Sequence, residues 1–152
     1  MVSVLLITDE RFLNHRPGEY HPEQPDRLRA VWSGISEAGL ADAIVCEPVQ
    51  PATDIDLLRC HQPDHLKALA SIDRRGGGRV DSDTEMSRGS LEAARLAAGA
   101  GITAIETLRS GVADIAFCAI RPPGHHARPS NAMGFCLFNN IAVAASALAE
   151  GG

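Results

Sequence analysis

Three short apolar runs, separated by segments with helical spacing, constrain the fold of this chain most strongly. Each run is long enough for one buried strand, and the three cover residues 2–8, 44–49 and 115–120. Apolar residues at helical spacing predict helices at 25–37, 55–60, 63–71, 90–109 and from Asn139 or Asn140 to Glu150. Strands that alternate with helices predict a mainly parallel sheet with helices on both faces. We therefore expect one three-layer α/β domain over residues 1–152.

The segment Arg121–Ala127 reads Arg-Pro-Pro-Gly-His-His-Ala and follows the third apolar run directly. In an open α/β sheet, the loops at the carboxyl ends of the strands converge on one crevice, where ligands bind. The prolines stiffen this loop, and Gly124 lets the backbone turn without a Cβ clash. Because histidine titrates near neutrality, His125 and His126 can act as a base and an electrostatic partner. The alternative is a pair of loop histidines that hydrogen-bond to backbone carbonyls.

Four blocks, in order along the chain, resemble the histone deacetylase family, which includes acetylpolyamine amidohydrolases and acetoin-utilisation proteins. They are the His-Pro-Glu segment at 21–27, residues 56–66, residues 81–87 with the Ala/Gly-rich helix after them, and the Pro-Pro-Gly-His-His loop with residues 133–140. The resemblance implies the amino-terminal portion of an arginase/deacetylase-like domain.

In that family, zinc polarises the acetyl carbonyl and its bound water while a histidine removes a proton. The resemblance implies that His125 is the electrostatic or acid partner and that His126 is the general base. It also implies that Phe135 lines the acyl-lysine tunnel, that Gly134 offers its carbonyl to the substrate, and that Asp81 binds the substrate backbone at the rim. From the residues alone, Asp81 is equally well a turn residue.

The same resemblance places His21 and Arg27 near the interior pocket beneath the metal. The family's zinc ligands, an Asp-x-His pair and a later Asp, are not matched, because Glu150 is the one acidic residue after Asp114. The family's tyrosine near the carboxyl end is not matched either, because Tyr20 is the single tyrosine. We therefore expect zinc in the complete domain, no metal ligands in this chain, and no activity of the chain alone.

Two functions of different classes follow. The first is a zinc-dependent deacetylase that hydrolyses acetyl-lysine, acetylpolyamines or related amides, with its activity belonging to a longer protein or to assembly with a complementing chain. The second is a non-catalytic binding or scaffold module derived from the same fold. The expected partners are an acylated lysine or polyamine substrate and a complementing chain or a second copy of this one.

Several other features suggest chemistry but have simpler interpretations. Cys136 could form a nucleophile–base pair with a histidine, but its apolar neighbours predict a raised thiol pKa. His61 and His65 are four residues apart, but Pro63 lies between them and is expected to start a helix after His61, so a shared metal is not expected. Residues 76–78 are three glycines, which predict a flexible loop.

Charge and hydropathy exclude further classes. The formal net charge is -5 and the basic residues are scattered, which argues against a nucleic-acid surface. No apolar run approaches the ~20 residues that span a bilayer, and the first residues lack the basic flank of a secretory signal. We expect a cytoplasmic protein without a membrane partner.

Overall fold

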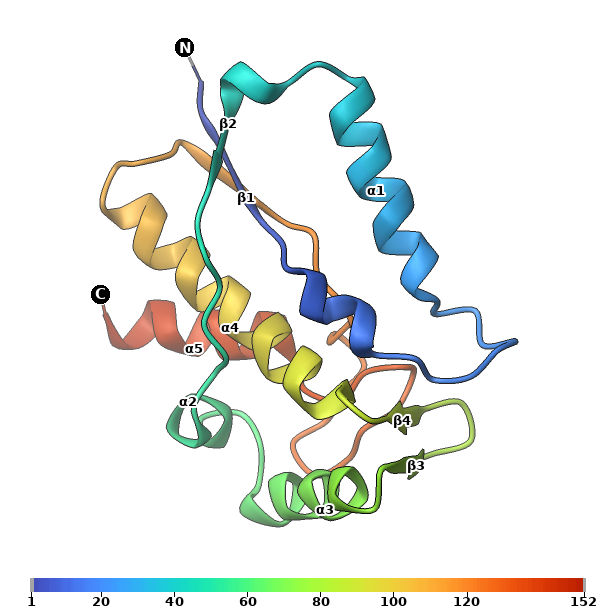
Figure 1. Ribbon diagram of the computed structural model, residues 1–152. Coiled ribbons are helices and arrows are strands. Elements are labelled where there is room, and N and C mark those ends of the chain that lie inside the picture. Colours follow the sequence, from blue (N-terminus) through green and yellow to red (C-terminus); the bar gives the residue numbers. More distant parts are fainter. Residues whose placement is uncertain (1, 152) are drawn as a thin grey trace.

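The computed structural model describes residues 2–151 and contains the predicted parallel sheet (Figure 1). The sheet has the strand order β2-β1-β5. Its strands are β1 (Val4–Ile7), β2 (Ile44–Cys46) and β5 (Ile115–Cys118). β1 lies in the centre and pairs in parallel with both neighbours, with Val4 opposite Ile44 on one side and Ile115 on the other. β5 is therefore an edge strand of this sheet.

The helices follow the predicted segments closely. α1 (Pro25–Glu37) and α4 (Ser90–Arg109) have the predicted bounds, whereas α3 (Pro63–Arg74) extends beyond its predicted end. The others are η1 (Glu10–Asn14), η2 (Ala41–Ala43), α2 (Asp54–Leu58) and α5 (Asn140–Glu150). Proline at the first position starts α1 and α3, because its fixed φ suits a helix and its missing N–H would have no partner there.

The sheet lies between helices, as expected for this fold class. Leu5 and Ile7 of β1 are fully buried and belong to the same core cluster as Leu96 and Ala100 of α4. α1 lies on the other side of the strands (Figure 1), where Phe117 of β5 remains about half exposed, at 49%. The face of the sheet toward α4 is thus well covered, whereas α1 covers the other face only in part.

The last two long helices pack closely because α4 contains glycine at the contact. A Cβ at Gly101 would come within 2.6 Å of the Cβ of Ala144 in α5. A side chain at this position would therefore push the two helices apart. This contact fixes α5, and with it the loop that leads from β5 into α5.

The prediction of a flexible loop at the three glycines is wrong for two of them. Gly77 and Gly78 form β3 (Gly77–Arg79), which pairs antiparallel with β4 (Glu85–Ser87). Gly77 has a φ of +114°, and a Cβ there would overlap the backbone carbonyl of Met86. Glycine is needed because the two backbones approach closely, not because the segment moves.

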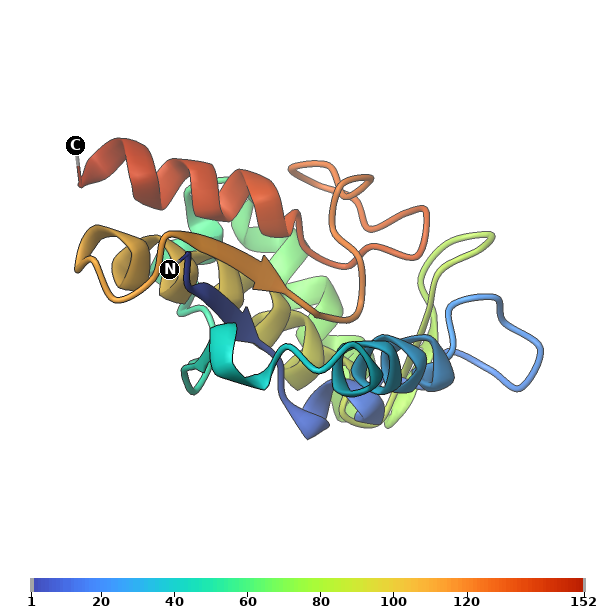
Figure 2. The ribbon, with the colours of Figure 1, turned by 90° about the horizontal axis from the view of Figure 1, so that it is seen from above.

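The loops that build the candidate site gather at one end of the sheet. Seen from above in Figure 2, the loop after β5 lies near the β3–β4 hairpin and the loop that precedes α1. This is the carboxyl end of β5, where an α/β sheet is expected to bind ligands. No helix in residues 2–151 is both long enough and apolar enough to cross a membrane.

Candidate active site

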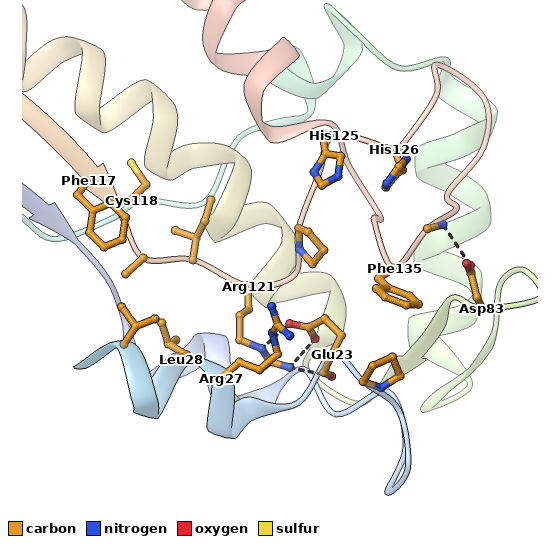
Figure 3. Close-up of a pocket in the computed structure, with 16 residues that line it drawn as sticks. Glu23, Arg27, Leu28, Asp83, Phe117, Cys118, Arg121, His125, His126 and Phe135 are labelled. Atoms are coloured by element: carbon orange, nitrogen blue, oxygen red, sulfur yellow. Dashed lines mark hydrogen bonds and ion pairs between the residues drawn. The ribbon is translucent and has the colours of Figure 1, made fainter. Parts of the chain in front are cut away.

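A cavity of about 610 Å³ opens at the carboxyl end of β5, between α1 and the loop that follows the strand (Figure 3). Four of the five predicted site residues line it: His125, His126, Gly134 and Phe135. Arg27, predicted to lie near an interior pocket, also lines it. The structure therefore brings most of the predicted site together.

The histidine pair lies on one wall of this cavity. The ring centroids of His125 and His126 are 4.3 Å apart and the rings are tilted by 47°. The start of α5 holds the loop in place, because the Asn140 side-chain amide donates to the Pro122 carbonyl at 3.2 Å. A Cβ at Gly124 would lie 2.5 Å from the Asn140 backbone nitrogen, so only glycine lets the loop pack against the helix. Both rings are exposed and aimed by a supported backbone.

Phe135 forms the part of the cavity wall next to His126 through an unusual backbone conformation. Its φ is +69° and that of Gly134 is +57°, in the left-handed region that side chains disfavour. Two hydrogen bonds hold the turn: Gly134 N–H donates to Asp83 Oδ1 at 3.1 Å, and Phe135 N–H donates to Thr84 Oγ1 at 3.0 Å. A Cβ at Gly134 would come within 2.7 Å of the His126 ring. The turn therefore brings Phe135 and His126 to adjacent parts of the cavity.

The fifth predicted residue, Asp81, lies away from this arrangement. Its carboxylate accepts from the neighbouring Ser82 backbone N–H at 2.7 Å, and it is not among the residues that line the cavity. Asp83, two residues later, lines the cavity and contacts the turn of Gly134 (Figure 3). The tight turn that leads into β4, with the Val80 and Asp81 N–H groups both bonded to the Thr84 carbonyl, directs Asp83 rather than Asp81 toward the cavity.

His21 lies beside the Phe135 wall. Its Nε2 donates to the Asp83 carbonyl at 2.9 Å, and its ring meets the Phe135 ring edge-on at 4.6 Å. Its Nδ1 accepts from the Glu23 backbone N–H at 3.1 Å. These bonds define a neutral imidazole with its proton on Nε2. His21 supports the rim hairpin and Phe135.

A buried ion pair forms the floor of the cavity. The guanidinium of Arg121 donates to Glu23 in a bidentate pair, at 2.7 Å from Nε and 2.6 Å from Nη2 (Figure 3). It also donates to the carbonyls of Phe12 at 2.8 Å and His15 at 3.0 Å. The two charged side chains are 4% and 7% exposed. The pair therefore ties the loop before α1 to the residue that starts the histidine loop.

His15 is buried next to this pair. Burial, followed by the positive charge of Arg121, lowers the pKa of His15 to about 3. Its Nε2 lies 3.4 Å from the Glu23 carboxylate, a contact that by itself would favour the charged ring. Because Arg121 already neutralises that carboxylate at shorter distances, we conclude that His15 stays neutral.

Cys136 fits the apolar interpretation rather than a nucleophilic one. It is fully buried, and its thiol donates to the Gly134 carbonyl at 3.2 Å. Burial raises the pKa of the thiol, which disfavours the thiolate that a nucleophile requires.

The sequence interpretation missed Glu23, Asp83, Thr84 and Arg121 as parts of the site. One signal was available for Arg121. An arginine directly after a buried strand needs a carboxylate partner, and a glutamate stands in the His-Pro-Glu segment. The sequence pattern alone has no comparable signal for Asp83, because its role depends on how the hairpin meets the Gly134 turn.

The fold and this cavity define an α/β protein with a histidine pair at the carboxyl edge of a parallel sheet. The family model of the histone deacetylase domain matches residues 21–152, and the chain belongs to the histone deacetylase family.

Individual relatives agree with this assignment. The chain is 41% identical to "Histone deacetylase 5" of Arabidopsis thaliana, covering 96% of this chain and 24% of that protein. It is 42% identical to "Histone deacetylase-like amidohydrolase" of Pseudomonas aeruginosa, covering 84% of this chain and 33% of that protein. A solved structure, that of the HDA15 HD domain, superimposes with a TM-score of 0.91 at 37% identity, covering 99% of this chain and 44% of that one. The chain thus spans well under two thirds of the length of these relatives.

Proposed function

We propose that the protein that contains this chain hydrolyses amides of acetylated amines, such as acetyl-lysine or acetylpolyamines. The observation that supports this most is the paired histidines that line one cavity together with the apolar ring of Phe135, in a chain of the histone deacetylase family. An apolar wall beside two imidazoles suits a substrate with a methylene chain that ends in an amide.

In the proposed reaction, water adds to the acetyl carbonyl carbon while His126 takes the water proton. The C–N bond then breaks, the amine leaves with a proton from a histidine, and acetate is released. His125 acts as the electrostatic partner and stabilises the charge that develops on the reacting groups. Phe135 contacts the methylene chain, and the Gly134 carbonyl has a second lone pair that can accept from the substrate amide.

Asp83 is the better candidate for holding the substrate backbone at the rim. One of its carboxylate oxygens accepts from the Gly134 N–H, which leaves the other for a substrate N–H. Asp81, which the resemblance suggested, remains the alternative. Comparing Asp83→Asn with Asp81→Asn decides between them: we expect a raised KM for the first and little change for the second.

Zinc is the metal that the family implies, and a catalytic zinc needs about three protein ligands. Among residues 2–151, no three His, Cys, Asp or Glu side chains are grouped closely enough to hold a metal ion. The described residues therefore do not fit a zinc site by themselves. We propose that the ligands lie outside them, in a longer protein or in a second chain, and we derive no step of the reaction through zinc.

Acetate release from an acetyl-lysine peptide and from acetylspermidine tests this function. The longest reading frame that contains these residues should release acetate, and His126→Ala should abolish most of the release. If a protein with a fully occupied zinc site bound either compound tightly without turnover, the result would favour a binding module instead. Loss of activity in Cys136→Ala with indifference to chelators would favour a thiol hydrolase.

A further inference from the structure

Two buried histidines outside the cavity contact the same loop that carries the site. His61 precedes α3 and His65 lies in its first turn, and they are 3% and 4% exposed. Their rings stack at a centroid distance of 4.9 Å. Neither lines the cavity, so the proposed reaction leaves their burial unexplained.

The hydrogen bonds of His61 define its protonation state. Its Nδ1 lies 3.1 Å from the Arg128 carbonyl, which can only accept, so Nδ1 carries the proton. Its Nε2 accepts from the Asn139 backbone N–H at 2.9 Å. Both ring nitrogens are therefore used, and only the neutral imidazole with its proton on Nδ1 can make both bonds.

His65 contacts the same loop. Its Nε2 donates to the Leu137 carbonyl at 2.9 Å. The Gln62 backbone N–H adds a bond to the Pro129 carbonyl at 2.8 Å. The segment 61–65 thus holds residues 128–129, where the loop leaves the histidine pair, and residues 137–139, where it enters α5.

Between these two anchored ends lie Gly134 and Phe135. Phe138 packs edge-on against both histidine rings, at 5.5 Å from His61 and 5.8 Å from His65. The Asn139 side chain donates to the Ala127 carbonyl at 3.0 Å, next to His126. A change at either end of the loop would therefore move the turn that packs against the His126 ring.

We propose that His61 and His65 are positioning residues that hold the two ends of the 128–139 loop together and thereby set the positions of Phe135 and His126 in the cavity. The effect of this positioning on catalysis rests on the proposed function, whereas the structural role does not. The contacts themselves can be tested without turnover.

The proposal requires both rings to stay neutral. Burial, followed by the neighbouring His65, lowers the pKa of His61, and burial lowers the pKa of His65. The titratable group that acts on His61 is His65 in α3, and the loop presents the backbone carbonyls of Arg128 and Pro129. A proton on His61 Nε2 would face the Asn139 N–H, two donors with no acceptor between them. Acidification below the lowered pKa should therefore release this end of the loop.

The test uses NMR of the chain itself. At pH 7.5, long-range nitrogen–proton correlations should show the His61 proton on Nδ1 and the His65 proton on Nε2. On acidification, the amide signals of Asn139, Gly134 and Phe135 should shift in step with the His61 ring. A His61 proton on Nε2 at pH 7.5, or loop signals that do not follow His61, would overturn the proposal. If the chain unfolds before His61 titrates, the tautomers at pH 7.5 decide.

Two variants separate the contacts. His61→Phe removes both bonds and should speed hydrogen exchange at the Asn139 amide by about tenfold to a hundredfold, the range for losing a buried hydrogen bond. His61→Gln can keep an acceptor near the Nε2 position without titrating, so it should restore slower exchange and remove the pH response. A control, Val49→Ala in the core cluster around Leu5 and Leu96, lowers global stability without touching the loop. The two variants are compared at equal global stability. If the Asn139 amide then exchanged equally fast in both, His61 and His65 would contribute to stability only, and the positioning role would be refuted.

Discussion

Breaking the buried ion pair between Glu23 and Arg121 should destabilise the chain more than any surface change. Glu23→Ala removes the carboxylate and leaves a guanidinium that is 4% exposed with backbone carbonyls as its partners. Removing one partner of a buried pair costs about 3–5 kcal/mol. Two lost charge-assisted bonds, each worth about 1.5–3 kcal/mol, sum to about 3–6 kcal/mol, which overlaps this range.

Urea unfolding followed by circular dichroism measures this loss. With a slope of roughly 2 kcal/mol per molar urea, the midpoint should fall by about 1.5–2.5 M. Glu23→Gln, which keeps one acceptor for Arg121, should lose less. Since native domains are commonly stable by about 5–15 kcal/mol, the alanine variant should retain a measurable transition.

A double-mutant cycle separates the pair from its surroundings. The double variant Glu23→Leu/Arg121→Met removes both charges, so it should cost clearly less than the sum of the two single changes, by at least about 2 kcal/mol. Additive single changes, or a cost below about 1 kcal/mol for Glu23→Ala, would refute the reasoning and show that water reaches the cavity floor.

Four further outcomes are expected. The pKa of His15 falls from 6.5 to about 3 on folding, so on acidification the unfolded chain takes up a proton before the folded chain does. The free energy of unfolding should therefore be highest above about pH 6.5 and fall between pH 6.5 and pH 3 by up to ~1.4 kcal/mol per pH unit. In urea unfolding at a series of pH values, His15→Gln should lose this part of the pH dependence. In an active protein that contains this chain, His126→Ala should lower kcat by roughly two to four orders of magnitude, and the double variant with His125→Ala should be less than additive; near-normal turnover would contradict the assignment of the base. Phe135→Ala should mainly raise KM, because it removes a contact with the methylene chain and no group that takes part in the reaction. A lowered kcat with an unchanged KM would count against this role. Since β5 is an edge strand with Ile115 and Phe117 about half exposed, the chain alone should self-associate in size-exclusion chromatography, and Phe117→Glu should reduce this; a monodisperse wild-type monomer would contradict it.

Local signals in the sequence predicted the elements well. The bounds of α1 and α4 could be read directly, because apolar spacing marks the buried face, while Gly39 follows the first and Ser110 and Gly111 follow the second. The side chain of Asn139, one of two predicted caps, accepts from the Ala142 N–H at 3.1 Å, as a helix start requires. The strands are shorter than their apolar runs, since pairing with β1 ends before hydrophobicity does.

The site residues also fall into two groups, those that local motifs predict and those that depend on contacts between distant parts of the chain. His125, His126, Gly134 and Phe135 could be found from the sequence because they lie within two short motifs of one loop region. The contact between Thr84 and Phe135 could not, because it joins residues 51 positions apart. The same holds for Glu23 and Arg121, which are 98 positions apart.

Local patterns in the sequence are thus enough to predict the α/β class, the helices around a parallel sheet, and the histidine loop at the end of β5. These depend on periodicity and on the stiff backbone of neighbouring residues. The tertiary structure was needed to show that Asp83 rather than Asp81 lines the cavity, and that the glycines at 77 and 78 form a strand. It also decided that His61 and His65 brace the site loop rather than forming part of the cavity. Each of these depends on which distant backbone a side chain meets, and no local pattern carries that information.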